Sequence, residues 1–322
     1  MGDSALPTSN FPPVPSQEPV RREDAVLERI AAIVGRRTIP RGEVHIGDDA
    51  AVLAPIVGEA LISTDVCVLG VHLDGSLFPL EDLGFKAVAS AVSDLAAMGG
   101  RPRAAVVAVS SPPGTDLEEL HRGIADAASM TNCPIVGGDL TRSRDVSVAV
   151  TVIGETPGKG SILRTDARPG DTIFVTGPLG RSAAGLRLRR EGAPLDHPLV
   201  VAHRRPWPRL EEGLAARHAG VNAMMDLSDG LGLDFNRLAD ASRVGFVLTD
   251  LPIAEGCTEY EAIGGGEDYE LVMTTADPDR LIDTYLRRGL RAPIAIGLVV
   301  RDVNVRTLRG EPLPRAGWQH EL

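Results

Sequence analysis

The chain has 322 residues, and its 44 acidic residues outnumber its 33 lysines and arginines, which gives a formal net charge of −11. Hydrophobic residues make up 43% of the chain and aromatic residues only 3%. This composition can bury a sizeable core, but it lacks the basic surface and the stacking aromatics of nucleic-acid binders. The apolar runs are too short for a membrane span. We therefore expect a globular protein with no nucleic-acid or membrane partner.

The N-terminal half begins with a proline-rich segment that we expect to be a disordered tail over residues 1–22. Apolar residues at helical spacing predict helices over 23–34, 80–98 and 116–130, the last of them capped by Thr115. Short runs rich in small and β-branched residues predict strands over 60–64, 103–110, 134–136 and 146–153. The first half is therefore expected to form one domain over residues 23–156.

A stretch rich in glycine, proline and basic residues over 154–171 predicts a domain boundary. Beyond it, strands are predicted over 172–176, 222–225, 246–249, 271–274 and 294–299, and helices over 182–190, 209–218 and 233–241. Because strands and helices are mixed in both halves, the fold class is α/β (α+β), with a second domain over 165–322. Cysteines at 67, 133 and 257 have no CxxC spacing, which favours reduced thiols in a cytoplasmic protein.

Several carboxylates lie among apolar and small residues instead of in charged surface runs. They are Asp48 and Asp49 in IGDDAAV, Asp65 in LISTD, Asp94 in VSDLAAMGG, Asp139 after IVGG, and Asp226 and Asp229 in MMDLSDG. An ionised carboxylate in such surroundings is costly unless it is paired, hydrogen-bonded or bound to a metal. Oxygen ligands without histidine or cysteine clusters suit Mg²⁺, and carboxylates around Mg²⁺ usually accompany bound phosphates. Together these segments predict metal-assisted phosphoryl transfer.

Each of these segments also has a purely structural interpretation. Asp94 shares one helix face with Ser90 and Lys86, four and eight residues earlier, and that face could simply be exposed. The Ser63–Asp65 segment is predicted at a strand end, where it could form an ordinary turn. Gly137–Asp139 could be a tight turn, and either Ser228 or Asp229 could cap the helix that follows. The phosphate-binding motif GxxxxGK[ST], the dinucleotide motif GxGxxG, HExxH and GxSxG are all absent.

Taken together, the motifs resemble those of the thiamine-monophosphate kinases, within the aminoimidazole-ribonucleotide-synthetase-like superfamily. The matching segments follow the family order over about residues 25–320: IGDDAAVL at 46–53, STD at 63–65, SDLAAMG at 93–99, GGD at 137–139, RTDARPGD at 164–171, VTGPLGRSAAGL at 175–186, MDLSDGL at 225–231, GGGEDYEL at 264–271 and GW at 317–318. DLSDGL, GGEDYEL and the GW pair are the segments most typical of the kinase.

The resemblance implies an N-terminal α+β domain that pairs across a homodimer and a C-terminal α/β domain folded against it. It implies direct transfer of the γ-phosphoryl of ATP to thiamine monophosphate, giving thiamine diphosphate and ADP, with several Mg²⁺ ions. It assigns the metal ligands to Asp49, Ser63, Thr64, Asp65, Asp94, Asp139, Asp226 and Asp229. Of these, Asp49, Asp65, Asp94, Asp139 and Asp226 are expected to be catalytic, through the metals that they bind.

For the two substrates, the resemblance places Gly138, Asp139, Arg164 and Ser228 at ATP, and His72, Glu267 and Trp318 at thiamine monophosphate. The sequence departs from the family pattern at Ala91, where asparagine is usual, and at Leu140, where threonine is frequent. Two alternatives stay open at this point: another ATP-dependent enzyme of the superfamily, and a non-catalytic paralogue that binds Mg-nucleotide.

Overall fold

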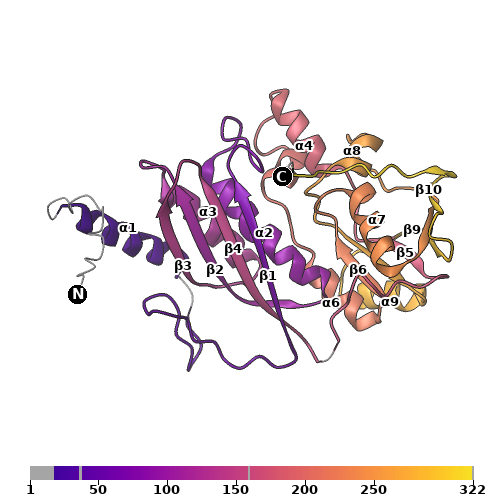
Figure 1. The fold of residues 1–322 in the computed structure, drawn as a ribbon, viewed down its shortest axis with the longest axis horizontal. Coiled ribbons are helices and arrows are strands. Elements are labelled where there is room, and N and C mark those ends of the chain that lie inside the picture. The colour runs from indigo at the N-terminus through magenta and orange to yellow at the C-terminus, as the bar shows by residue number, and fades with distance from the viewer. Residues whose placement is uncertain (1–17, 36–37, 159, 321–322) are drawn as a thin grey trace, which may run out of the picture.

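The computed structural model describes residues 18–35, 38–158 and 160–320. Its N-terminal half contains α1 (Glu18–Val34), β1 (Glu59–Val68), α2 (Leu80–Ala97), β2 (Arg101–Ser111), α3 (Leu117–Met130), β3 (Ile135–Arg142) and β4 (Ser147–Thr156). Strands β1–β4 form one sheet in the order β1-β4-β2-β3. β4 is antiparallel to both of its neighbours, and β2 and β3 are parallel. Helices α2 and α3 pack on each other and cover one face of this sheet (Figure 1).

The alternation of side chains along the strands explains which face is covered. Val148, Val150 and Val152 of β4 are fully buried beneath the helices, because residues two apart on a strand point to the same side. The opposite face carries Ile62 and Val66 of β1, which are 72% and 50% exposed. One face of the sheet therefore forms the core, and the other leaves apolar side chains in solvent.

The C-terminal half is built around a second, seven-stranded sheet. Its elements are β5 (Thr172–Val175), α4 (Arg181–Arg190), α5 (Pro198–Arg204), α6 (Leu210–Ala219), β6 (Ala223–Asp226), α7 (Leu231–Ser242), β7 (Gly245–Leu248), α8 (Glu259–Gly264), β8 (Leu271–Thr275), α9 (Pro278–Arg287), β9 (Ile294–Val300), β10 (Arg306–Leu308) and β11 (Glu311–Pro312). The strand order is β11-β10-β7-β9-β5-β8-β6, and only β10 and β7 run parallel. This mixed architecture confirms the predicted α/β (α+β) class with two sheet domains.

Helix α2 joins the two halves. It contacts β1, β4 and α3 on one side and α5, α6 and β6 on the other, so almost all of its residues are buried. Its alanines and its one glycine, Gly84, allow the neighbouring backbones to come close. The fully buried Asp82 of α2 accepts hydrogen bonds from Arg204 and from Arg205 at the end of α5, at 2.5 to 2.9 Å. The charged pairs and the packing fix α2 between the halves, where Asp94 is held near both domains.

Several boundaries differ from the prediction. Helix α1 begins at Glu18, so the predicted tail is too long by residues 18–22, and residues 1–17 lie outside the described part of the chain. The Ser63–Asp65 segment lies inside β1 instead of at its end, because the following residues continue to pair with β4. The Gly137–Asp139 segment likewise lies within β3, paired with β2, and is not a turn. Helix α3 is capped by the Asp116 side chain, which accepts from the Glu119 backbone N–H, and not by Thr115.

Helices α5, α8 and α9 and strands β10 and β11 were not predicted from the sequence. The two shorter helices, α5 and α8, have only seven and six residues, too few for a periodic apolar pattern to emerge. Within the described residues, no helix is long and apolar enough to cross a membrane.

Candidate active site

A cavity of about 620 Å³ lies where the two halves meet. Its walls come from β1 and the loop after it, from α2, α4 and α5, from the segments around 226–229 and 266–269, and from the C-terminal segment. Many predicted site residues lie on these walls: Thr64, Asp65, His72, Asp94, Asp226, Ser228, Asp229, Glu267 and Trp318. Residues from both halves of the chain therefore face one space.

The acidic end of the cavity forms where β1 packs against α2, because the spacing of the polar side chains is nearly the same along the two elements. Ser63 and Asp65 are two apart on β1 and face the same side, about 6.6 Å from each other along the strand. Ser90 and Asp94 are four apart on α2, about 6 Å along the helix. Because the two steps are nearly equal, two cross-pairs form. The Ser63 hydroxyl donates to Asp94, and the Asp65 carboxylate is hydrogen-bonded by Ser90.

The third carboxylate of this cluster comes from the other domain. Asp226 ends the buried strand β6 and accepts a hydrogen bond from the Ser93 hydroxyl of α2 at 2.7 Å. Burial, aided by the charge of Asp94, raises the pKa of Asp226 to about 8 and that of Asp65 to about 6. Burial also raises the pKa of Asp94. Three crowded carboxylates thus hold protons more tightly than usual when no cation lies among them.

This donor set fits a hard cation. The oxygen atoms of Asp65, Asp94 and Asp226 and of neighbouring hydroxyls are the ligands that Mg²⁺ prefers, and a divalent charge would relieve the repulsion that raises these pKa values. Within the described residues, no group of three or more His, Cys, Asp or Glu side chains is placed so that it could hold a metal ion by itself. A bound Mg²⁺ would therefore need further oxygen ligands, such as hydroxyl groups, water and phosphate oxygens.

The other end of the cavity combines aromatic, imidazole and carboxylate groups. Trp318 is 51% exposed, and its backbone N–H donates to the Asp229 carbonyl at 2.9 Å, which holds the C-terminal segment over the cavity. His320 lies between the Trp318 ring and the His72 ring, with centroid distances of 6.0 and 5.5 Å. The His72 Nδ1 accepts from the Val68 backbone N–H at 3.0 Å, so the imidazole is fixed in one orientation.

Lys86 is a central residue of this site whose partner sequence reasoning missed. Its side chain is fully buried, and its ammonium donates to the Glu267 carboxylate at 2.7 Å and to the His72 carbonyl at 3.0 Å. The sequence placed Lys86 on the Asp94 face of the helix, but its partner Glu267 is 181 residues away. From the buried side of the cavity, the Lys86 ammonium therefore holds two predicted substrate residues, Glu267 by its carboxylate and His72 by its backbone carbonyl.

His203 of α5 was also not predicted. It lines the cavity with its Nδ1 atom 3.0 Å from the Ser182 hydroxyl and 3.5 Å from the Glu267 carboxylate. Burial, together with the charges of Lys86 and Arg190, lowers the pKa of His203 to about 2, so the imidazole is neutral. Its RRPWPR surroundings contain no feature that marks it as a cavity residue. Only the packing of α5 on α2 and α4 brings it there.

The structure does not bring every predicted residue into this cavity. Asp49 is exposed in the segment before β1 and does not line it. Gly138 and Asp139 are on β3, the opposite edge of the sheet from β1, three strand spacings or about 14 Å away. Arg164 is outside the lining, although its charge opposes the raised pKa of Asp94.

The role of the DLSDG segment differs from the capping prediction. Gly230 is the N-cap of α7, and neither Ser228 nor Asp229 caps it with a side chain. Instead Asp234 accepts from the backbone N–H groups of Asp229 and Gly230, at 2.8 and 3.1 Å. Ser228 and Asp229 both lie on the cavity wall, and the Asp229 carboxylate forms an ion pair with Arg237.

Comparison with known proteins agrees with this geometry. Residues 47–156 match the model of the AIR synthase related protein N-terminal domain, and residues 168–307 match that of the C-terminal domain. The chain is 34% identical over 277 residues to a thiamine-monophosphate kinase of Bacillus subtilis, covering 80% of this chain and 85% of that protein.

Solved structures of other proteins are also similar to this chain. A thiamine-monophosphate kinase from Stenotrophomonas maltophilia superposes with a TM-score of 0.77 at 32% identity, covering 89% of this chain and 96% of that one. A structure described as AaThiL complexed with AMPPCP and TMP gives 0.71 at 28% identity, covering 93% and 97%. The chain therefore belongs to the thiamine-monophosphate kinase family, within the AIR synthase related proteins.

Proposed function

We propose that the chain transfers the γ-phosphoryl group of ATP to the phosphate of thiamine monophosphate, giving thiamine diphosphate and ADP. The observation that carries the proposal is one cavity with two chemically different ends: the Asp65, Asp94 and Asp226 cluster, and the His72, Glu267 and Trp318 group. The first suits metal-bound phosphates, and the second suits a cationic heterocycle. A relative in the family has been solved with an ATP analogue and TMP.

The chemistry needs positioning more than proton transfer. The acceptor is already a phosphate anion, so no general base is required, and the barrier comes mainly from the repulsion between the two phosphates. Magnesium ions, when bound, would supply the charge that offsets this repulsion. We propose that Asp65, Asp94 and Asp226 hold them, with Ser63, Thr64 and Asp229 nearby. For Asp49, Gly138, Asp139, Arg164 and Ser228, the support for a metal or ATP contact is the family pattern.

The substrate end would recognise the thiazolium through charge and ring contacts. The face of Trp318 can attract a cation, and the Glu267 carboxylate supplies a negative charge. Lys86 keeps Glu267 in a single orientation from the buried side. The His72 ring also lines the cavity, and its Nδ1 accepts a hydrogen bond from the Val68 backbone N–H.

We also propose a homodimer that covers the exposed sheet face. Ile62 and Val66 on β1 and Val106 on β2, the two strands that flank β4, are 72%, 50% and 37% exposed, which is unusual for side chains of this type. A second copy of the chain would bury them. Light scattering should give twice the chain mass, and a monomer would refute the dimer. The three free thiols fit the proposed cytoplasmic location.

The deciding experiment incubates the full chain with ATP, Mg²⁺ and thiamine monophosphate and measures thiamine diphosphate by chromatography. Replacing thiamine monophosphate with thiamine should abolish turnover, because the reaction needs a phosphate acceptor. ATP binding without any turnover would identify a non-catalytic paralogue. Turnover of thiamine alone would overturn the substrate assignment.

A further inference from the structure

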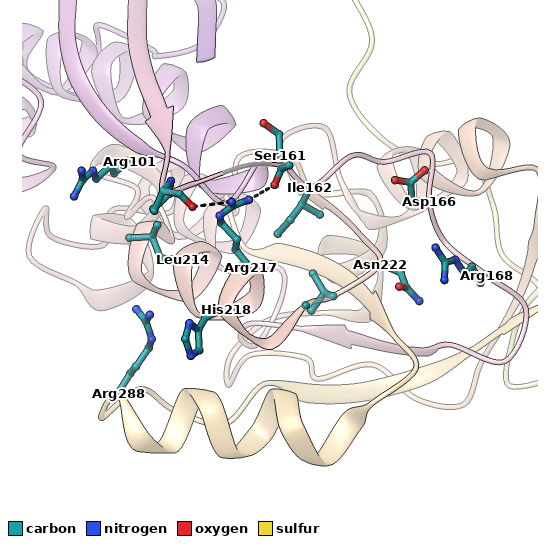
Figure 2. A pocket seen from close by; sticks show the side chains of 14 residues that line it. Arg101, Ser161, Ile162, Asp166, Arg168, Leu214, Arg217, His218, Asn222 and Arg288 are labelled. Atoms are coloured by element: carbon teal, nitrogen blue, oxygen red, sulfur yellow. Dashed lines mark hydrogen bonds between the residues drawn. The ribbon is translucent and has the colours of Figure 1, made fainter. Parts of the chain in front are cut away.

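A second cavity, of about 650 Å³, lies apart from the proposed active site and shares no lining residue with it. It is bounded by the segment that connects the two halves, by α6, by the turn before β6 and by the end of α9 (Figure 2). Arg101, at the start of β2, reaches it from the N-terminal domain. Asp166 and Arg168 belong to the RTDARPGD segment, and the other lining residues lie outside the family motifs.

The lining of this cavity is strongly basic for so acidic a chain. Four arginines and His218 face one aspartate, Asp166, whereas the whole chain has a formal net charge of −11. In Figure 2, Arg288 and His218 lie together at one end, Arg168 lies at the other, and Arg217 lies between them. The positive groups therefore surround the space instead of forming a single point of charge. Such a cavity concentrates anions.

The four arginines fall into two kinds. Arg101 and Arg217 are already held: Arg101 by the buried Glu155 carboxylate at 2.6 Å, and Arg217 by carbonyl oxygens of the connecting segment, including that of Pro157 at 2.8 Å. Arg168 and Arg288 are exposed, and their guanidinium groups have no hydrogen-bond or ion-pair partner within the described residues. Arg101 and Arg217 therefore form a fixed basic wall of the cavity. The guanidinium groups of Arg168 and Arg288 are free to bind a ligand from opposite ends.

We propose that this cavity binds a compact polyanion that carries two or more phosphoryl groups. Guanidinium groups match phosphate oxygens with paired hydrogen bonds, and a single phosphate would leave one end of the cavity without a counter-charge. The lining contains no phenylalanine, tyrosine or tryptophan on which a base could stack, so the phosphoryl groups themselves are the recognised feature. Inorganic pyrophosphate is the simplest member of this class.

The test is titration calorimetry of the full chain with inorganic pyrophosphate in a metal-free, chelator-containing buffer at low ionic strength. Without metal, the acidic active site repels the probe, so binding reports the basic cavity. We expect saturable binding that weakens as salt is raised. Removing both unpaired guanidinium groups, in the R168A/R288A variant, should weaken it about tenfold or more.

Two matched variants complete the design. R122A/R144A removes the same charge from exposed positions on α3 and on the turn before β4, and it should bind like the unchanged protein. Asp94→Asn alters the acidic site and should also leave binding unchanged. Absence of binding, equal weakening in R122A/R144A, or loss of binding in Asp94→Asn would each overturn the proposal. None of these outcomes depends on whether the chain is a kinase.

Discussion

We expect the replacement of Lys86 and the replacement of Glu267 to lower the stability of the protein by different amounts. The Lys86 side chain is fully buried, whereas the Glu267 side chain is 23% exposed to the cavity. Replacing Lys86 with methionine keeps an apolar chain of similar volume in the buried space and leaves a carboxylate that water can still reach. Replacing Glu267 with methionine leaves a buried ammonium whose remaining partner is the His72 carbonyl at 3.0 Å. The second change should therefore cost more.

The sizes follow from what each variant leaves unpaired. K86M leaves a carbonyl and a partly hydrated carboxylate, which should lower the free energy of unfolding by about 1–3 kcal/mol. E267M leaves an uncompensated buried charge, which should lower it by about 3–5 kcal/mol. In the double variant neither charge remains, so its cost should be smaller than the sum by about 2 kcal/mol or more.

Urea unfolding of the four proteins, followed by circular dichroism in metal-free buffer, measures these differences as a double-mutant cycle. If K86M costs as much as E267M, the difference in exposure between the two side chains has no energetic effect. If the two costs simply add, the 2.7 Å contact contributes no coupling and the reasoning is wrong.

Three further predictions concern the metal site and the core. Asp94→Asn should lower kcat roughly 100-fold or more with little change in stability, and a rate near that of the unchanged protein would remove Asp94 from the site. Because burial raises the pKa of Asp226 to about 8 and that of Asp65 to about 6, Mg²⁺ binding at pH 7 should release protons, and its affinity should rise between pH 6 and pH 8. Calorimetry in two buffers of different ionisation heat checks this, and a heat independent of the buffer would contradict it. Gly123→Ala should lower the melting temperature, although alanine usually favours a helix by about 1 kcal/mol, because the new Cβ would lie 1.7 Å from the Glu81 carbonyl of α2. An unchanged or higher melting temperature would refute the close packing of α2 and α3.

Local chemistry made much of the fold predictable. The long helix α2 and the strands β1, β2 and β4 follow from apolar periodicity and from the glycines that end α2. Two of the missed helices carried readable signals. Thr258 and Glu261 form a capping box at α8, and Asp277 followed by Pro278 begins α9. In α9 only Leu281 and Tyr285 are buried, so the apolar stripe is too narrow to stand out from its polar neighbours.

The sequence by itself determined which residues carry charge among apolar neighbours, and the order of its motifs identified the family. It could not determine which of them meet, because contacts between distant segments depend on how helices and sheets pack, and that depends on burial summed over the whole chain. The tertiary structure alone joined Lys86 to Glu267 across 181 residues and brought Asp226 to Ser93. It also separated Asp139 from Asp65, since the strands that carry them form opposite edges of one sheet.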